Sequence, residues 1–311
     1  MELIKSINEI KEKISSSSLT IGTFDGMHRG HIYLIDETLK FSNEDSNSSV
    51  VVTFNPNPFV VLNSINEQAY HLIEKEEKYD ILNSLGINFL LELDFNEEMA
   101  EIGAPEFLKD FIVSPFNPKN IIIGHDHHFG KNRRGNDVFL KENESKHQYT
   151  LSVLKPFSLE GETVSSSAIR KFIKTGDMIT ANKYLGRNYK VKGKVVEGNG
   201  VGRELDFPTA NIGLDTIDQI IPKDGVYFVK IKINSDNYHG MCNIGCRPTV
   251  SSEDVISIEV HIFNYFKFDL YAQFIEIEFV DYVRSEKKFR NKEALKLQLI
   301  KDKEYCKSIQ I

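Results

Sequence analysis

Hydrophobic residues in the first half of the chain gather in short runs, separated by longer stretches with helical spacing. Five runs are typical of buried strands: LTIG at 19–22, VVVTF at 50–54, FLLEL at 89–93, NIIIG at 120–124 and YTLSVL at 149–154. The stretches with helical spacing lie at 29–40, 74–85, 97–113, 166–173 and 177–184. This alternation predicts an α/β domain whose parallel sheet is covered by helices on both faces.

Beyond Tyr184 the hydrophobic period falls to two residues, which is typical of half-buried strands. Turn residues such as NSDN at 234–237 separate the strand-like segments, which read YKVKGKVVEG, GVYFVKIKIN, YHGMCNIG, VISIEVHIF and QFIEIEFVDY. One amphipathic helix follows at about 290–308. We therefore expect a doubly wound domain over 1–185 and an antiparallel β-barrel with a terminal helix over 186–311.

Length and composition agree with two soluble domains. The 311 residues exceed the size, about 250–300 residues, at which a single core usually stops growing. Hydrophobic residues make up 41% of the chain and charged residues 27%. A net charge of −7 argues against a general binder of nucleic acids or membrane surfaces.

Targeting signals and cysteine usage indicate the compartment. No apolar run approaches the roughly 18 residues of a membrane helix, and MELIKSINEIKEKI lacks the apolar core of a signal peptide. The three cysteines, Cys242, Cys246 and Cys306, form no CxxC pair, which favours free thiols in a reducing compartment. We expect a cytoplasmic protein; no pattern in the chain indicates its oligomeric state.

The segment TIGTFDGMHRGH at 20–31 places two histidines at the start of a predicted helix. His28 and His31 are three residues apart, so they face the same way on the first turn, and Gly30 leaves the backbone between them accessible. The N–H groups at a helix start favour phosphate, and imidazole donors stabilise charge on a phosphate undergoing in-line substitution. Taken alone, the segment is explained as well by a surface turn with two unrelated histidines.

Three further segments follow predicted strands, where ligands bind in sheets of this kind. They are TFNPNP at 53–58, GHDHHFGKNRRG at 124–135 and VSSSAIR at 164–170. Each has an ordinary explanation: a proline-rich turn, a solvated charged loop and a helix cap. Their shared position at the carboxyl ends of strands favours one phosphate-binding site.

These segments, followed in order by GRELDFPTAN, NIGCRPT and IEVHIF, resemble the bifunctional bacterial riboflavin kinase/FAD synthetase family over essentially the whole chain. HxGH alone would indicate only the wider nucleotidyltransferase superfamily. The resemblance implies that the first half transfers AMP from ATP to FMN, giving FAD and pyrophosphate. It implies that the barrel phosphorylates riboflavin with ATP, and that both reactions use Mg²⁺. The partners are then small molecules: riboflavin, FMN and ATP.

For the first half, the resemblance implies that His28 and His31 contact the ATP phosphates and stabilise the transition state. Ser166 and Arg170 would hold the β- and γ-phosphates, and Asn55 would lie near the flavin phosphate. The remaining ATP-binding residues would be Gly22, Phe24, Asp25, Gly26 and Asp126.

For the barrel, Pro208 fixes the backbone so that Thr209 and Asn211 project together as hard oxygen donors for magnesium. In ISIEVHIF, Glu259 shares the strand face opposite the isoleucines, which alone would leave it merely solvated. The resemblance makes Glu259 the base that activates the riboflavin 5′-hydroxyl. It also implies that Gly198, Gly200 and Gly202 form a flap over ATP. Arg247 would contact the flavin.

The chain departs from the family pattern at a few positions. Thr23, Asn57 and Asp206 stand where the family commonly has Asn, His and Gly, and HLIEKEEK replaces an arginine-containing loop near His71. Two alternatives therefore stay open: an enzyme with one of the two activities, or a flavin-binding regulator without turnover. A pure binder needs neither the histidine pair nor the Glu259 base, so the bifunctional enzyme is favoured.

Overall fold

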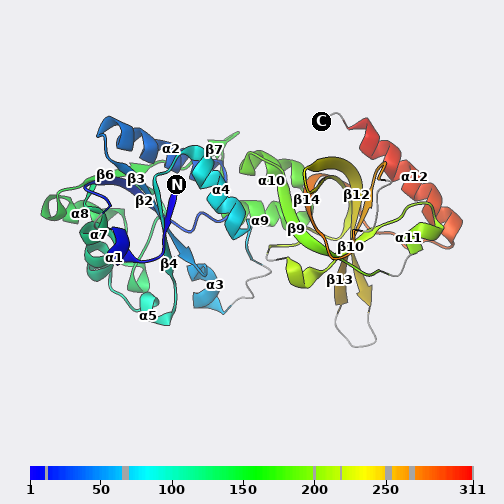
Figure 1. Cartoon of the computed structure of the whole chain (residues 1–311), viewed down its shortest axis with the longest axis horizontal. Coiled ribbons are helices and arrows are strands. Elements are labelled where there is room, and N and C mark those ends of the chain that lie inside the picture. Colours follow the sequence, from blue (N-terminus) through cyan, green and yellow to red (C-terminus); the bar gives the residue numbers. More distant parts are fainter. Residues whose placement is uncertain are drawn as a thin grey trace. The chain divides into compact units, whose positions relative to one another are not determined.

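The computed structural model describes residues 1–10, 13–64, 70–198, 201–217, 219–248, 254–265 and 270–309. Contacts divide the chain into two compact units, Met1–Ser166 and Ser167–Ile311 (Figure 1). Within the described residues, no helix has the length and apolar character needed to cross a membrane.

The first unit is built on a parallel sheet of six strands in the order β1-β4-β3-β2-β5-β6. The strands are β1 (Glu2–Ile4), β2 (Ser17–Ile21), β3 (Ser48–Asn55), β4 (Phe89–Asp94), β5 (Pro118–Gly124) and β6 (Thr150–Leu154). The five predicted strands are confirmed, but β6, predicted to be buried, lies at the edge of the sheet and is only partly buried. β1 was not predicted, because three residues are too few to show a period.

Helices cover both faces of this sheet, as the alternation predicted. Val51 packs into a core with Ile35 of α2 (Arg29–Glu44) and Leu82 of α4 (Lys75–Leu85). Its neighbours Val50 and Val52 point to the other face. There the sheet is covered by α1 (Ile7–Ile10), the π-helix Phe107–Val113, α7 (Ser114–Phe116) and α8 (Asp137–His147). Strands buried on both faces explain why these runs are almost continuously apolar.

The single helix predicted over 97–113 is wrong. The chain instead forms α5 (Glu97–Ala100), α6 (Ala104–Glu106) and the π-helix. α5 ends at Ala100 with Glu101 as its C-cap, and Gly103 is the N-cap of α6, with Pro105 in its first turn. Proline suits a helix start but not an interior, so it divides the helical pattern here. Other unpredicted elements are α3 (Pro58–Asn63), α8 and the hairpin β7 (Ser158–Leu159) with β8 (Glu162–Thr163).

The second unit begins with α9 (Ser166–Thr175) and α10 (Met178–Leu185), which match the predicted helices. Asn182 of α10 joins this helix to the barrel: its Oδ1 accepts from the Tyr189 N–H at 2.7 Å and its Nδ2 donates to the Phe279 carbonyl at 2.8 Å. The contacts thus group α9 and α10 with the barrel. The boundary between 185 and 186 stays a prediction about where the chain can be cut.

The barrel is closed and antiparallel, with the strand order β10-β13-β12-β11-β14-β9. Its strands are β9 (Tyr189–Val196), β10 (Ala210–Ile212), β11 (Gly225–Ile233), β12 (Asp236–Pro248), β13 (Asp254–Ile262) and β14 (Phe274–Arg284). The predicted turn joins β11 to β12, with Asn234 in the left-handed region at a φ of 55°. α11 (Val201–Glu204) precedes β10, which was not predicted as a strand.

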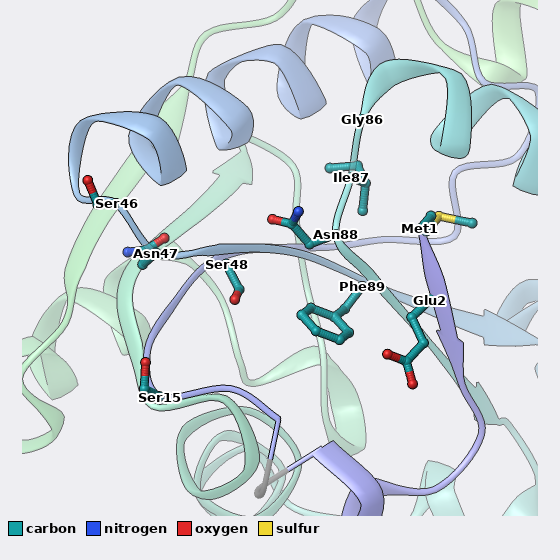
Figure 2. Close-up of a pocket in the computed structure, with 10 residues that line it drawn as sticks. All are labelled: Met1, Glu2, Ser15, Ser46, Asn47, Ser48, Gly86, Ile87, Asn88 and Phe89. Carbon is teal, nitrogen blue, oxygen red and sulfur yellow. The ribbon is translucent and has the colours of Figure 1, made fainter.

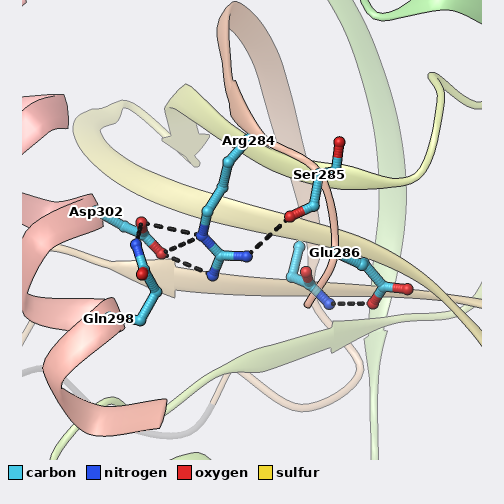
Figure 3. Close-up of polar contacts among 6 residues, drawn as sticks. Arg284, Ser285, Glu286, Gln298 and Asp302 are labelled. Atoms are coloured by element: carbon cyan, nitrogen blue, oxygen red, sulfur yellow. Dashed lines mark hydrogen bonds and ion pairs between the residues drawn. The ribbon is translucent and has the colours of Figure 1, made fainter. Parts of the chain in front are cut away.

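The terminal helix, predicted at about 290–308, is α12 (Lys292–Ser308). Its Cys306 packs with Phe228 and Met241 in a core outside the barrel. A buried ion pair joins the helix to β14: Arg284 donates to both carboxylate oxygens of Asp302, at 2.8 to 3.0 Å (Figure 3). The barrel and helix of the predicted fold are confirmed.

Candidate functional site

The loop that follows β2 turns sharply before the histidines. Phe24 and Met27 have left-handed φ values of 50° and 39°, and Gly26 has a φ of 86°. Such values are uncommon for bulky residues, so the surroundings must hold them. Phe24 is 1% exposed, and a Cβ on Gly22 would stand 3.3 Å from its ring. We call residues 22–27 the phosphate loop.

The two histidines lie together at the start of α2. His28 is the N-cap of the helix, and its Nδ1 accepts from the His31 N–H at 3.3 Å. The two rings are stacked, with centroids 3.6 Å apart and planes 15° from parallel. Since Nδ1 accepts, the proton of a neutral His28 ring is on Nε2, which is then a donor. A Cβ on Gly30 would stand 3.2 Å from the His28 ring, so glycine leaves room for the stack.

Asp25 and Ser166 tie the phosphate loop in place. The Asp25 carboxylate is buried and accepts from the Leu72 N–H at 2.9 Å, while His71 Nδ1 lies 4.0 Å from the same oxygen. The Ser166 hydroxyl donates to the Asp25 carbonyl at 2.8 Å. The hydrogen bonds of these two side chains therefore hold the phosphate loop against its neighbours. Arg170, half-buried, lies one turn further along α9.

The other predicted residues of the first unit lie at the carboxyl ends of β3 and β5. Asn55, the last residue of β3, is exposed. Asn57 instead caps α3, accepting from the Phe59 N–H at 2.9 Å, so it has a structural task of its own. The Asp126 side chain is 83% exposed, and its Oδ1 lies 3.9 Å from His125 Nδ1.

Two buried polar side chains in this region were not predicted. Lys78 of α4 is 8% exposed, and its Nζ donates to Thr53 Oγ1 at 3.4 Å. The buried Nε2 of His127 makes no hydrogen bond within the described part of the chain. Burial lowers the pKa of His127 to about 4, so this ring is neutral at physiological pH. Lysine in a polar helix and histidine in a polar loop give no sequence signal of burial.

In the barrel, three predicted residues come together on neighbouring strands. The Thr209 hydroxyl donates to Glu259 Oε2 at 3.3 Å. Asn211 of β10 lies directly opposite Glu259 of β13, so their side chains share one face of the sheet. The structure thus groups two neutral oxygen donors around one carboxylate.

Two glycines beside this group lie so close to neighbouring residues that a side chain would not fit. A Cβ on Gly198 would stand 1.9 Å from the Asn211 amide nitrogen, and one on Gly202 would stand 2.3 Å from the Phe207 carbonyl. Gly200 lies outside the described residues. Asp206 has a left-handed φ of 63°, the conformation that glycine adopts most easily and Asp tolerates. Its carboxylate lies 2.5 Å from Lys296 Nζ of α12.

Two further side chains join this group. The alternation in ISIEVHIF predicts that His261 shares the strand face of Glu259, whereas Asn243 has no sequence signal. Asn243 of β12 also lies opposite Glu259, and its Nδ2 donates to Glu286 Oε1 at 3.5 Å. His261 Nδ1 lies 2.9 Å from the Pro208 carbonyl, so its N–H orders the residue that precedes Thr209. Arg247 lies in β12, and its side chain falls outside the described part of the structure.

Comparison with known proteins identifies both units. Residues 10–168 match the family model of FAD synthetase, and residues 185–310 match that of riboflavin kinase. A relative from Buchnera aphidicola subsp. Schizaphis graminum is 36% identical, over 99% of this chain and 98% of its own. The chain belongs to the bifunctional riboflavin kinase/FMN adenylyltransferase family.

Other members of the bifunctional riboflavin kinase/FMN adenylyltransferase family agree over nearly the full length. The Bacillus subtilis relative is 34% identical, over 95% of this chain and 93% of its own. A crystal structure described as a macrolide-efflux protein from Streptococcus pneumoniae is 30% identical, with a TM-score of 0.88 and 99% coverage of each chain. That description concerns the other protein; what the two chains share is the fold.

A hollow of about 560 Å³ lies at the opposite edge of the sheet, where β1, β3 and β4 begin (Figure 2). Its lining is largely polar and includes Asn47, Ser48 and Asn88. No residue predicted for the two reactions of the riboflavin kinase/FMN adenylyltransferase family lines it. Ligands of parallel α/β sheets bind at the carboxyl ends of the strands, so this hollow is not the adenylyl-transfer site.

Proposed function

We propose that this chain makes FMN from riboflavin in the barrel and FAD from FMN in the first unit. The observation that carries the proposal is that each unit brings the groups for one phosphate reaction together. The stacked histidines lie at the helix start in one, and Thr209, Asn211 and Glu259 lie together in the other.

In adenylyl transfer, an oxygen of the FMN phosphate attacks the α-phosphorus of ATP, and the bond to the departing pyrophosphate breaks. Negative charge grows on the equatorial oxygens and on the leaving group. The Nε2–H of His28, together with His31, donates to those oxygens beside the N–H groups at the start of α2. Arg170 of α9 holds the β- and γ-phosphates that leave, together with the backbone N–H of Ser166, whose hydroxyl donates to the Asp25 carbonyl. Asp126 contacts the nucleotide, and Asn55 contacts the flavin phosphate.

In riboflavin phosphorylation, the 5′-hydroxyl attacks the γ-phosphorus of ATP, and ADP leaves. The Glu259 carboxylate accepts the hydroxyl proton as the new O–P bond forms. The Thr209 hydroxyl donates to Glu259 and so orients the carboxylate. Gly198 and Gly202, whose missing side chains allow close approach, let the backbone cover the nucleotide.

The barrel residues also fit a magnesium ion. Within the described residues no cluster of three His, Cys, Asp or Glu side chains could hold a metal alone. Mg²⁺ is commonly held by few protein oxygens together with substrate phosphates, and it then neutralises phosphate charge. Thr209 and Asn211 supply such oxygens beside Glu259. We therefore assign them as the ligands of an ATP-bound Mg²⁺.

The alternatives would leave one of these groups without a purpose. A chain with one activity has no use for both the histidine pair and Glu259, and a regulator without turnover needs neither. Two incubations of the purified protein with ATP and magnesium, one with riboflavin and one with FMN, followed by separation of the flavins, distinguish the three. The proposal predicts FAD with FMN as an intermediate; FMN alone would mean one activity, and unchanged riboflavin would contradict the proposal.

A further inference from the structure

A buried lysine, Lys78, is connected to the phosphate loop through Thr53, and its charged group makes few hydrogen bonds. The ammonium group of Lys78 carries three N–H donors, yet within the described residues it makes one hydrogen bond, to Thr53, and no ion pair. Burial of an ammonium group is costly unless other groups compensate for it. Burial lowers the pKa of Lys78, while the charges of Glu92 and Asp25 act in the opposite direction.

Thr53 passes this contact on to the phosphate loop. Its hydroxyl accepts from Lys78 Nζ at 3.4 Å and donates to the Thr23 carbonyl at 3.3 Å. The hydrogen bonds therefore run from the helix α4 through β3 to the backbone of the loop. Thr53 is fully buried, so water does not compete for its hydroxyl.

The hydrogen bonds from Lys78 reach the residue before Phe24, the strained residue of the loop. Thr23 precedes Phe24, and its carbonyl receives the hydrogen bond from Thr53. A buried aromatic residue keeps a left-handed φ of 50° only where its neighbours are held. The same loop leads directly into His28.

We propose that Lys78 is a positioning residue for adenylyl transfer. Through Thr53, it holds the Thr23 carbonyl so that the phosphate loop presents His28 and His31 to the ATP phosphates. The inference rests on the proposed adenylyl transfer, in which this loop leads into the two histidines.

The test uses the full chain with Lys78→Met, Thr53→Val and both changes together. FAD formation from added FMN is measured at varied ATP, and thermal melting of the full chain, compared with the wild type, reports whether the first unit, which carries both changes, is folded. Hydrogen bonds to charged groups are strong enough that each single change should lower kcat/KM for ATP about ten- to a hundredfold. The double variant should lose no more than the worse single variant, because both changes break one chain of contacts.

Two further variants separate this role from general stability. Lys75→Met removes a lysine of the same helix, one turn earlier, whose Nζ already lies 2.6 Å from Glu92 and whose side chain is 40% exposed. It should leave adenylyl transfer unchanged. Thr53→Ser keeps the hydroxyl and should restore most of the activity lost in Thr53→Val.

Additive losses in the double variant, or an equal loss in Lys75→Met, would overturn the inference. If Lys78→Met does not fold, the comparison of Thr53→Val with Thr53→Ser tests the inference instead. Equal FAD formation in these two variants would also overturn the inference. A wild-type chain that makes no FAD from FMN would contradict the proposed function instead, before any variant is compared.

Discussion

The proposed magnesium ligands Asn211 and Thr209 give a prediction at the scale of single side chains. Each supplies one oxygen beside Glu259, and the affinity for Mg²⁺ depends on the number of such ligands. Asn211→Ala and Thr209→Ala should therefore raise the magnesium concentration needed for half-maximal FMN formation. FAD formation from added FMN serves as the control. Titrations that coincide with the wild type would exclude the ligand role.

Gly198 is a second residue whose effect follows from its surroundings. A methyl group there would stand 1.9 Å from the Asn211 amide, so Gly198→Ala must displace Asn211 or the strand end. We expect a loss of riboflavin phosphorylation of about tenfold or more, since displaced catalytic geometry is costly. Gly103→Ala is the matched control, because Gly103 has an ordinary φ of −67° and the nearest atom to its missing Cβ, on Pro105, would stand 3.8 Å away. Full kinase activity in Gly198→Ala would contradict the close approach.

At the scale of elements, α12 depends on the Arg284–Asp302 pair. The Asp302 side chain is 2% exposed and also accepts from Gln298 Nε2 at 2.7 Å (Figure 3). Asp302→Ala leaves a largely buried guanidinium without its partner, which typically costs about 3–5 kcal/mol. The free energy of unfolding of the second unit, measured in denaturant, should fall by that order.

An exposed ion pair of the same helix provides the control. Lys292 pairs with Glu204, and both side chains are more than 60% exposed. Lys292→Ala should leave the unfolding curve nearly unchanged, because exposed pairs contribute little. Equal effects of Asp302→Ala and Lys292→Ala would mean that the buried pair does not hold α12.

The elements also show what the pattern of residues could predict. Apolar runs located β2 to β6, although β6 lies at the edge of the sheet and is only partly buried, and period-two runs located the long barrel strands. β1 and β10, of three residues each, are defined by their partners in the sheet rather than by their own pattern. The helix predicted over 97–113 divides at Gly103, because capping and proline geometry prevail over helical spacing.

For the candidate sites, the sequence located the groups but not their surroundings. His28 and His31 are close in sequence, so a helix start brings them together by itself. The contact of Thr209 with Glu259 spans fifty residues and follows only from barrel closure. The burial of Lys78 and the exposure of Asp126 depend on neighbouring elements, which no local pattern encodes.

At the scale of the whole molecule, the limits of the barrel domain can be tested with fragments. The sequence predicts that 186–311 folds alone and phosphorylates riboflavin. Asn182 of α10 bonds to Tyr189 and Phe279, and Phe172 packs against Tyr184 with ring centroids 5.2 Å apart. We therefore expect 167–311 to melt at a higher temperature than 186–311, with kinase activity in both. Equal melting temperatures would mean that α9 and α10 add nothing to the barrel.

The central claim is that one chain carries two separate active sites, and two variants test it most directly. Chromatography of the flavins after incubation with ATP and magnesium is the measurement. His31→Ala should turn riboflavin into FMN and lose about 10²–10³-fold in FAD formation. Glu259→Gln should leave riboflavin unchanged, with a loss of roughly 10²–10⁴-fold, yet convert added FMN to FAD. A mixture of the two variants should then make FAD from riboflavin. If either variant lost both reactions while remaining folded, or if the mixture made no FAD, the account of two independent sites would be contradicted.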